Sequence, residues 1–170
     1  MTISMYQASA PVLVQSLKGL LRVIDKAEAY AKARKIDEQV LLQMRIFPDM
    51  FAFVRQCQIV TDNAKGAVAR LAGQTPPAYE DNEASFAELR ARVTKTIAFL
   101  KTLDRKSFAG AENKEIILKF PSATLEYKGG DYVNKFVLPN VYFHITIAYG
   151  ILRNLGVKLG KPDYLGGGEG

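Results

Sequence analysis

The sequence predicts an all-α protein, an up-down bundle of four long helices with a short helix after the first and a small β-hairpin before the last. Apolar residues recur at alternating steps of three and four in four long segments, which is the spacing of one helix face. Cap-forming and turn-forming residues separate these segments. No low-complexity tract or long linker divides the 170 residues, so a single domain over residues 1–170 is expected.

The first two long helices are marked by residues at their ends. Ser4 is expected to cap a first helix of roughly eight turns, in which Pro11 kinks the chain or begins the regular part. Asp37 opens a short helix, residues 48–49 begin the second long helix, and Gly73 ends it. The apolar stripe of the first helix is Tyr6, Ala10, Leu13, Leu17, Leu20, Ile24, Ala27 and Ala31.

A change of pattern follows the third long helix, which is expected over residues 86–103. Residues 115–120 and 123–127 have the composition of strands around a Pro-Ser turn and predict the hairpin. Asp131 is expected to cap a short helical piece, and the tail from residue 161 is expected to be irregular.

The fourth long helix is the least polar segment of the chain. Pro139 and Asn140 mark its start and Gly156 its left-handed end, and its length falls short of the roughly 20 apolar residues that a membrane span needs. Phe143 and Ile147 point away from the inward stripe, so either the hairpin or a second copy of the chain must cover them. We therefore expect a homodimer.

The composition of the chain indicates where the protein is located in the cell and which classes of partner it lacks. The chain is 48% hydrophobic and carries a net charge of +6, with its 23 Lys and Arg scattered in ones and twos rather than clustered as in a nucleic-acid footprint. Its single cysteine, Cys57, excludes an internal disulfide and fits a reducing compartment. The first residues lack the charged start of a secretory signal, so a cytoplasmic protein is expected, with neither membrane nor nucleic acid as partner.

Four segments together carry a resemblance to a known family. They are FPDMF (47–51), QCQIVTDNAK (56–65), ARLAG (69–73) and LPNVYFHITIAYGILRNLGVKLGKPDYLG (138–166). The chain resembles a bacterial family catalogued only as a domain of unknown function, within the DinB-like (damage-inducible) superfamily of four-helix bundles. The resemblance implies a bundle that often forms homodimers through helix faces. It also implies a divalent metal held by three histidines, and relatives that act as thiol-dependent transferases or hydrolases.

The histidine pattern implied by the resemblance is degenerate in this chain. His144 stands at one suitable position of the last helix, but the residue four later is Ala148. On the second long helix, Gln58, Thr61 and Asp62 occupy the expected level, and none is a histidine. We therefore expect no cofactor, with weak binding of a divalent metal through His144 left open.

His144 and Asp62 are the first candidate ligand-binding residues. Bundle interiors hold metals through inward ligands, and a carboxylate such as Asp62 could orient the imidazole of His144 across the bundle. The plainer alternatives are a half-buried histidine bonded to a carbonyl or a tyrosine, and an aspartate paired with Lys65 or Arg55.

Tyr142 and Tyr149 complete the candidate ligand-binding set, together with Gln58 and Thr61. Tyrosines near the hairpin and the last helix could line an amphipathic pocket, or could be side chains of the core rim or of an interface. Cys57 falls on the centre of its stripe, where a thiol behaves as a small apolar group, although a Cys–His pair with His144 is a conceivable nucleophile.

Two functions of different classes follow. The first is a protein that binds a small molecule or a partner near His144 and the tyrosines, without the three-histidine metal site. The second is a transferase or hydrolase dependent on a divalent metal or a thiol, with His144 in the site. Whether any reaction is catalysed stays open, and DNA binding has only the mild basic charge in its favour.

Overall fold

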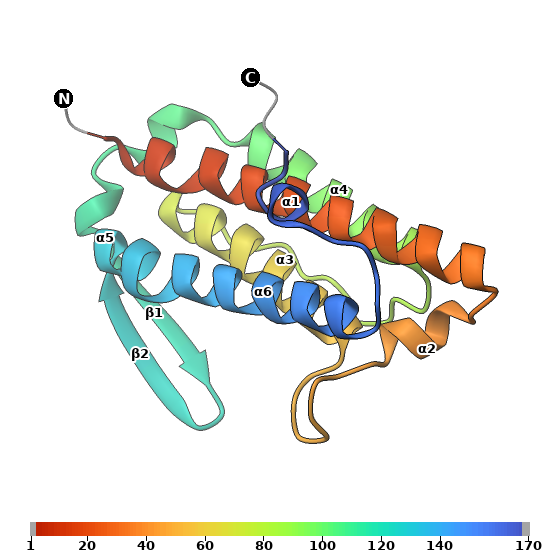
Figure 1. Cartoon of the computed structure of the whole chain (residues 1–170). Helices are drawn as coiled ribbons and strands as arrows, with labels where there is room; N and C mark the ends of the chain where they lie inside the picture. The colour runs from red at the N-terminus through yellow and green to blue at the C-terminus, as the bar shows by residue number, and fades with distance from the viewer. Residues whose placement is uncertain (1–2, 168–170) are drawn as a thin grey trace.

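The computed structural model describes residues 3–167 as a mostly helical structure with one two-stranded sheet (Figure 1). The long helices are α1 (Met5–Arg34), α3 (Phe53–Leu71), α4 (Phe86–Thr102) and α6 (Leu138–Asn154). The strands are β1 (Glu115–Phe120) and β2 (Ala123–Lys128). The shorter elements are α2 (Glu38–Leu42), 3-10 turns over Arg105–Phe108 and Ala111–Asn113, α5 (Gly129–Asp131), a π-helix over Tyr132–Val137, and α7 (Lys161–Tyr164).

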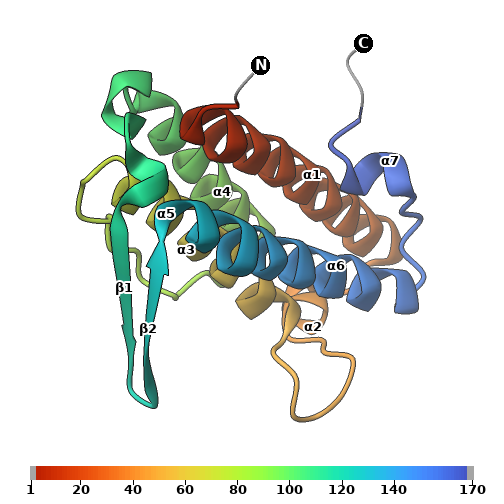
Figure 2. The ribbon, with the colours of Figure 1, turned by 90° about the vertical axis from the view of Figure 1, so that its left-hand side faces the viewer.

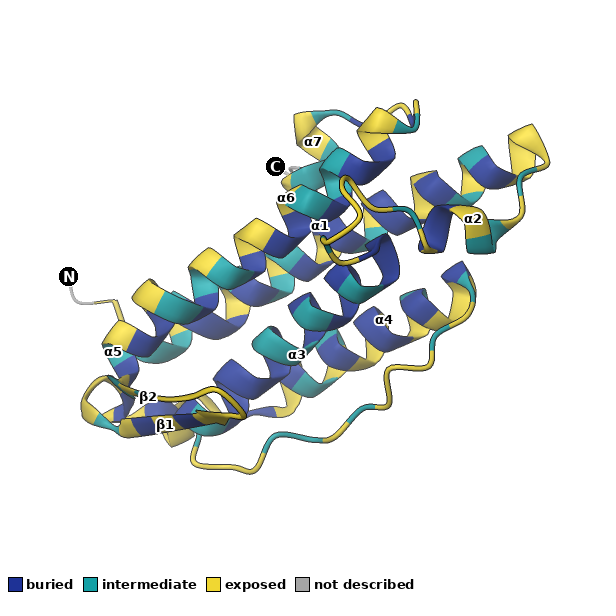
Figure 3. Ribbon diagram, turned by 90° about the horizontal axis from the view of Figure 1, so that it is seen from below, coloured by how far each residue is buried: buried dark blue, intermediate teal, exposed yellow. Residues whose placement is uncertain are grey.

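The four long helices share one apolar core. Leu17, Val60, Val93 and Ile145, one from each long helix, are all fully or almost fully buried in it. Helix α3 packs against both α4 and α6, and α1 packs against α3, α4 and α6. Figure 3 shows most of α3 in the colour of buried residues, so α3 is the most buried of the long helices.

Most helix ends lie where the sequence predicts them. The hydroxyl of Ser4 accepts a hydrogen bond from the Gln7 amide, and Asp37 accepts one from the Gln39 amide at 2.9 Å. Gly73 and Gly156 both have positive φ, at 77° and 89°, as left-handed helix ends require. The interactions that form these helix ends are local in sequence, since each cap involves residues only two to four positions apart.

The start of α3 differs from the expectation. The sequence favours a helix from residues 48–49, but residues 43–52 form a loop and α3 begins at Phe53. The amide of Phe53 donates to the Met44 carbonyl at 2.8 Å, which closes the loop on itself before the helix begins. Asp49 is therefore an exposed loop residue and caps no helix. This loop carries two exposed aromatic side chains, Phe47 and Phe51.

The entry into α6 is helical rather than broken. Asp131 lies inside continuous helical backbone, where it pairs with Lys135 at 2.9 Å, so the expected cap at this residue is wrong. The π-helix ends just before Pro139, whose ring removes an amide hydrogen and crowds the preceding turn. A wider π turn accommodates such a residue without ending the helix.

The hairpin is confirmed, with Glu115 opposite Lys128 and Phe120 opposite Ala123. Ile116 and Leu118 are buried, whereas Ile117 and Phe120 are exposed. Figure 2 shows the hairpin projecting away from the layer of long helices, so only the part of it near α5 contributes to the core.

The C-terminal segment is more regular than expected. Residues Lys161–Tyr164 form α7, which lies beside α1 (Figure 2). The carboxylate of Asp163 accepts a hydrogen bond from the Gly160 amide at 2.8 Å, which fixes the first turn. No helix within residues 3–167 is both long and apolar enough to cross a membrane.

Candidate functional site

The six residues predicted as ligand-binding lie in three separate places. Gln58, Thr61 and Asp62 belong to a polar cluster around Arg92, between α3, α4 and the loop over residues 73–84. His144 lies between α6 and α3, where it contacts Gln56. Tyr142 borders a groove between α1, α6 and α7, and Tyr149 packs on a residue of that groove.

The first place is built around the buried guanidinium of Arg92, whose side chain is only 2% exposed. Burial by itself lowers the pKa of this group, but the carboxylates around it outweigh that effect and raise the pKa. Its partners are Thr61 Oγ1 (2.7 Å), the Glu80 carbonyl (2.8 Å), Asp62 Oδ1 (2.8 Å), Glu83 Oε1 (3.0 Å) and Asp81 Oδ1 (3.0 Å).

The neighbours of Arg92 extend the cluster across the loop. Gln58 donates to Glu83 at 2.8 Å, and Lys65 pairs with Asp62 at 3.0 Å. The ring of Tyr79 lies 4.8 Å from Lys65 Nζ, 5.3 Å from the Arg92 guanidinium carbon and 4.3 Å from Lys95 Nζ. Each charged side chain that contacts Arg92 or Tyr79 has an opposite charge or an aromatic ring as its partner. The cluster therefore holds the loop over residues 73–84 against α3 and α4.

The second place holds His144 in one tautomer. Gln56 donates its amide N–H to the Phe51 carbonyl at 3.0 Å, so its oxygen faces His144 Nδ1 at 2.6 Å. Nδ1 must therefore carry the proton. Nε2 makes no hydrogen bond within the described residues, where every fully buried polar side-chain atom has a partner. Nε2 is thus the open nitrogen, and burial, followed by the charge of Arg55, lowers the pKa of the imidazole.

The residues around His144 do not fit a three-histidine metal. Ala148, four residues later, is fully buried in the core and offers no ligand atom. Asp62 is engaged by Arg92 and Lys65, and it lies six residues beyond Gln56, about 9 Å along α3. Within the part of the chain that the structure describes, no three His, Cys, Asp or Glu side chains are grouped to hold a metal ion.

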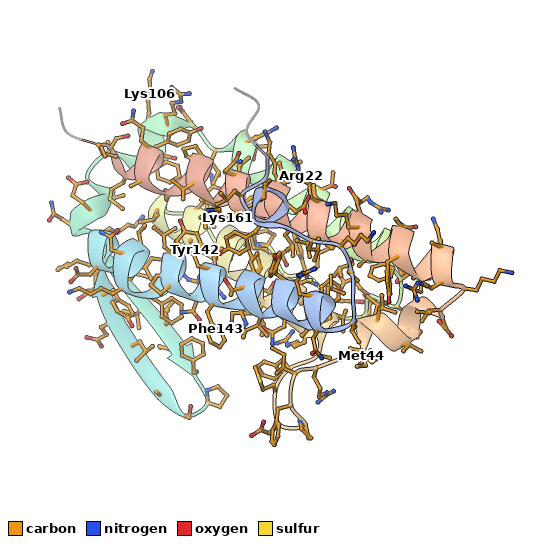
Figure 4. The ribbon with its side chains drawn as sticks, in the orientation of Figure 1. Arg22, Met44, Lys106, Tyr142, Phe143 and Lys161 are labelled. Carbon is orange, nitrogen blue, oxygen red and sulfur yellow. The ribbon has the colours of Figure 1, made fainter. Side chains whose placement is uncertain are left out.

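The third place is a groove of about 630 Å³ between α1, α6 and α7. Most of its wall is apolar, and its volume lies within the range of small-molecule sites. Figure 4 shows Tyr142 on the side of α6 that faces α1, whereas Phe143 points to the opposite side. The lining residues are Pro11, Val12, Gln15, Ser16, Tyr142, Tyr164 and Leu165.

The polar groups of the groove are few and are held by hydrogen bonds between different elements. Gln15 donates to the Leu165 carbonyl at 2.8 Å, which ties α7 to α1 across 150 residues of sequence. Tyr164 accepts a hydrogen bond from Thr146 at 3.3 Å, and its ring meets Tyr149 edge to face at 6.2 Å. Burial and the nearby Tyr164 raise the pKa of Tyr142, so this phenol is a neutral donor at pH 7.

Cys57 is fully buried in the core. Burial in apolar surroundings raises the pKa of its thiol far above neutrality, so the thiolate needed for nucleophilic attack is absent at pH 7. The Cys–His pair considered from the sequence is therefore not a nucleophile in this structure.

Several residues of these places are missing from the candidates predicted by sequence. Arg92 sits between Leu89 and Thr96 on the inward stripe of α4, and a charged residue on an apolar stripe is a signal that was available. Gln56 and Tyr164 give no such signal, because their partners His144 and Thr146 are distant in sequence.

Comparisons with known proteins agree with this architecture. A family described as a domain of unknown function (DUF1993) matches residues 5–165. The crystal structure of a DinB family member protein from Shewanella denitrificans is similar, with 40% identity and a TM-score of 0.87, and the match covers 97% of this chain and 93% of that one. No curated protein matches. The chain therefore belongs to the DUF1993 family, an uncharacterised DinB-like family of unknown function.

Proposed function

We propose that this protein binds a small, mainly apolar molecule in the groove between α1, α6 and α7, without a three-histidine metal site. The observation that carries the proposal is the groove itself, which has about 630 Å³ of space, an apolar wall, and the Tyr142 hydroxyl at its border. Sites of this kind combine apolar walls with a few polar groups that orient the ligand. The long helices, taken as an up-down DinB-like bundle, supply the rigid frame.

An uncharged fluorescent probe tests this proposal directly. N-phenylnaphthylamine is weakly fluorescent in water and brightens in apolar sites, and we expect saturable binding to the wild-type protein. Val12→Phe should abolish that binding by filling the groove, whereas Ala29→Phe, on an exposed part of α1 that does not line it, should not.

Melting temperatures of both variants show whether they fold, and Ser16→Phe replaces Val12→Phe if the latter does not. Unsaturable binding to the wild type would contradict the proposal, as would equal binding to a folded groove-filling variant.

We also propose that a second copy of the chain covers the opposite side of α6. Phe143 is 56% exposed there, so the hairpin leaves it largely uncovered. The loop with Phe47 and Phe51 and the tip of the hairpin project on this same side of α6 (Figure 1). An apolar surface of this kind is typical of an interaction site.

Light scattering tests the dimer. A dimer mass is expected for the wild type and for Ala98→Asp, which adds a charge to an exposed position of α4. A monomer mass is expected for Phe143→Asp, because a buried unpaired charge opposes association. A monomeric wild type at working concentration would overturn this proposal and leave the groove unaffected.

The metal- or thiol-dependent transferase or hydrolase is the second candidate function, and one observation supports it. His144 Nε2 is open while Nδ1–H is held by Gln56, the orientation that a metal-binding histidine commonly has. Thermal melts with Zn²⁺, Ni²⁺ and Mn²⁺ separate the candidates, since a ligand of the folded state raises the melting temperature. A rise in the wild type that is lost in His144→Ala would favour this candidate over the first.

A further inference from the structure

The stretches of α1, α6 and α7 that border the groove carry more positive than negative charge. Helix α1 carries only Lys18 and Arg22 between Met5 and Ile24, and no carboxylate. Helix α6 has no charged residue from Leu138 to Leu152. Lys18 follows the groove residue Gln15 by three positions, and Arg22 follows Lys18 by four, so the three share one side of α1.

Helix α7 adds one cation and one carboxylate. The carboxylate of Asp163 is already satisfied, because it accepts from Lys26 Nζ at 2.8 Å and from the Gly160 amide at 2.8 Å. Lys161, by contrast, forms no salt bridge within residues 3–167, and neither do Lys18 and Arg22. Figure 4 shows Arg22 and Lys161 beside α7. The groove therefore lies in a region of net positive charge, in which Asp163, whose carboxylate is also attracted by Arg22, is the one carboxylate on the described stretches of α1, α6 and α7 that border it.

Two hydroxyl groups of the groove, those of Tyr142 and Tyr164, have a proton free to donate to a ligand. Tyr164 accepts its hydrogen bond from Thr146, which leaves the Tyr164 O–H free to donate. Tyr142 makes no hydrogen bond to another side chain or to the backbone within the described chain. The Tyr164 ring also packs on Tyr149, which limits where its hydroxyl can lie. Two hydroxyl donors in a positively charged region favour a ligand whose hydrogen-bond acceptor carries a negative charge.

We propose that the ligand of this groove is an amphiphile with a carboxylate head and an apolar body. The apolar body lies against Pro11, Val12 and Leu165, and the carboxylate oxygens accept hydrogen bonds from Tyr142 and Tyr164. Lys18, Arg22 and Lys161 supply the attraction that selects an anion over a neutral molecule of the same shape. This inference rests on the groove being a small-molecule site, as proposed above, and adds the chemical class of what it takes.

Three probes with the same ten-carbon chain test the charge preference. Decanoate, decan-1-ol and decyltrimethylammonium compete with N-phenylnaphthylamine for the groove of the full chain at low salt. Decanoate is expected to displace the dye about tenfold more tightly than decan-1-ol, and the cation least tightly. In about 0.5 M salt, the difference in affinity between decanoate and decan-1-ol should become smaller, because exposed charges are then screened.

Variants assign the preference to named groups. Tyr142→Phe keeps the ring and removes the donor, so decanoate should bind about tenfold more weakly, and a direct dye titration of this variant gives the reference affinity for the competition. Lys18→Gln and Arg22→Gln should each weaken decanoate about threefold, whereas Lys101→Gln, an exposed lysine of α4, should have no effect.

Equal displacement by decan-1-ol and decanoate, or tighter binding of the cation, would overturn this inference while the groove remained a binding site. If the dye did not bind at all, that result would instead contradict the proposed function, on which this inference rests. Loss of decanoate affinity in Lys101→Gln to the same extent as in Lys18→Gln would show a general charge effect and would also contradict it.

Discussion

The carbonyl of Tyr164 rests on Gly19: a Cβ at position 19 would lie 2.1 Å from that oxygen. Only a residue without a side chain permits so close an approach, since real Cβ contacts are more than 3 Å long. This contact packs α7 against α1, and α7 and the residue after it supply Tyr164 and Leu165 to the groove.

We therefore predict that Gly19→Ala displaces α7 and reduces dye binding in the groove. The forced shift of backbone should lower the free energy of unfolding by about 1–3 kcal/mol. Gly150→Ala is the matched control, because its new Cβ would meet only the end of Ile46 at 3.8 Å. Urea unfolding and dye titration measure both effects, and an unchanged affinity in Gly19→Ala would show that α7 is not needed for the groove.

The Arg92 cluster gives a prediction on stability. Arg92→Leu leaves the largely buried Glu83 without a cation, whereas Asp62 and Asp81 keep Lys65 and Arg55, so the change should cost about 1–3 kcal/mol. The control is Arg90→Leu, because the Arg90 side chain is 35% exposed and pairs with Asp25 and Glu28. That change should cost about 1 kcal/mol or less.

The loop over residues 73–84 provides a second readout for Arg92. Limited proteolysis should cut this loop faster in Arg92→Leu than in the wild type, because the guanidinium holds the Glu80 carbonyl and two loop carboxylates. Equal losses of stability in Arg92→Leu and Arg90→Leu, with no faster cleavage, would contradict the inference that the Arg92 cluster holds this loop in place.

The single histidine predicts a pH dependence with a definite sign. The pKa of His144 is lowered in the folded state, so the folded protein binds this proton less readily than the unfolded chain does. The contribution to stability is complete above the unfolded pKa, about 6.5, and is lost as the pH falls toward the folded value. Urea unfolding between about pH 7.5 and pH 5 should show this loss in the wild type, and a smaller one in His144→Asn.

A proton NMR titration reports the same group directly, because His144 gives the only imidazole signals of the protein. A midpoint at or above the ordinary histidine value would refute the lowered pKa and the burial that causes it. Gln56→Leu serves as a further probe, since it removes the acceptor of Nδ1–H and should shift the titration.

Cys57 should be inert in the folded protein. Its thiol is buried among core residues and its pKa is raised, so an aromatic disulfide reagent should react only after unfolding. Exposed thiols of a small peptide provide the reference rate. Rapid reaction with the native protein would revive a thiol-dependent chemistry and would argue against the packing of α3.

The helices and their ends were largely predictable from sequence, because those signals act over a few residues. Ser4, Asp37, Gly73 and Gly156 each mark a helix end through a local cap or a positive φ. The errors at α3 and α7 arose where a contact beyond one helical turn decides. The Phe53 amide donates to the Met44 carbonyl across the loop, so α3 starts later than predicted, and α7 forms where the chain returns to Gly19 of α1.

By itself, the sequence determined a mostly helical chain with a hairpin, and a family resemblance without the family's histidines. Tertiary structure alone decided that Asp62 serves Arg92 rather than His144, that His144 faces Gln56, and that Tyr142 borders a groove closed by α7. The reason is physical. Helix periodicity fixes which side of a helix a residue occupies, whereas a site depends on which other helix meets that side, and packing across the whole chain sets that meeting.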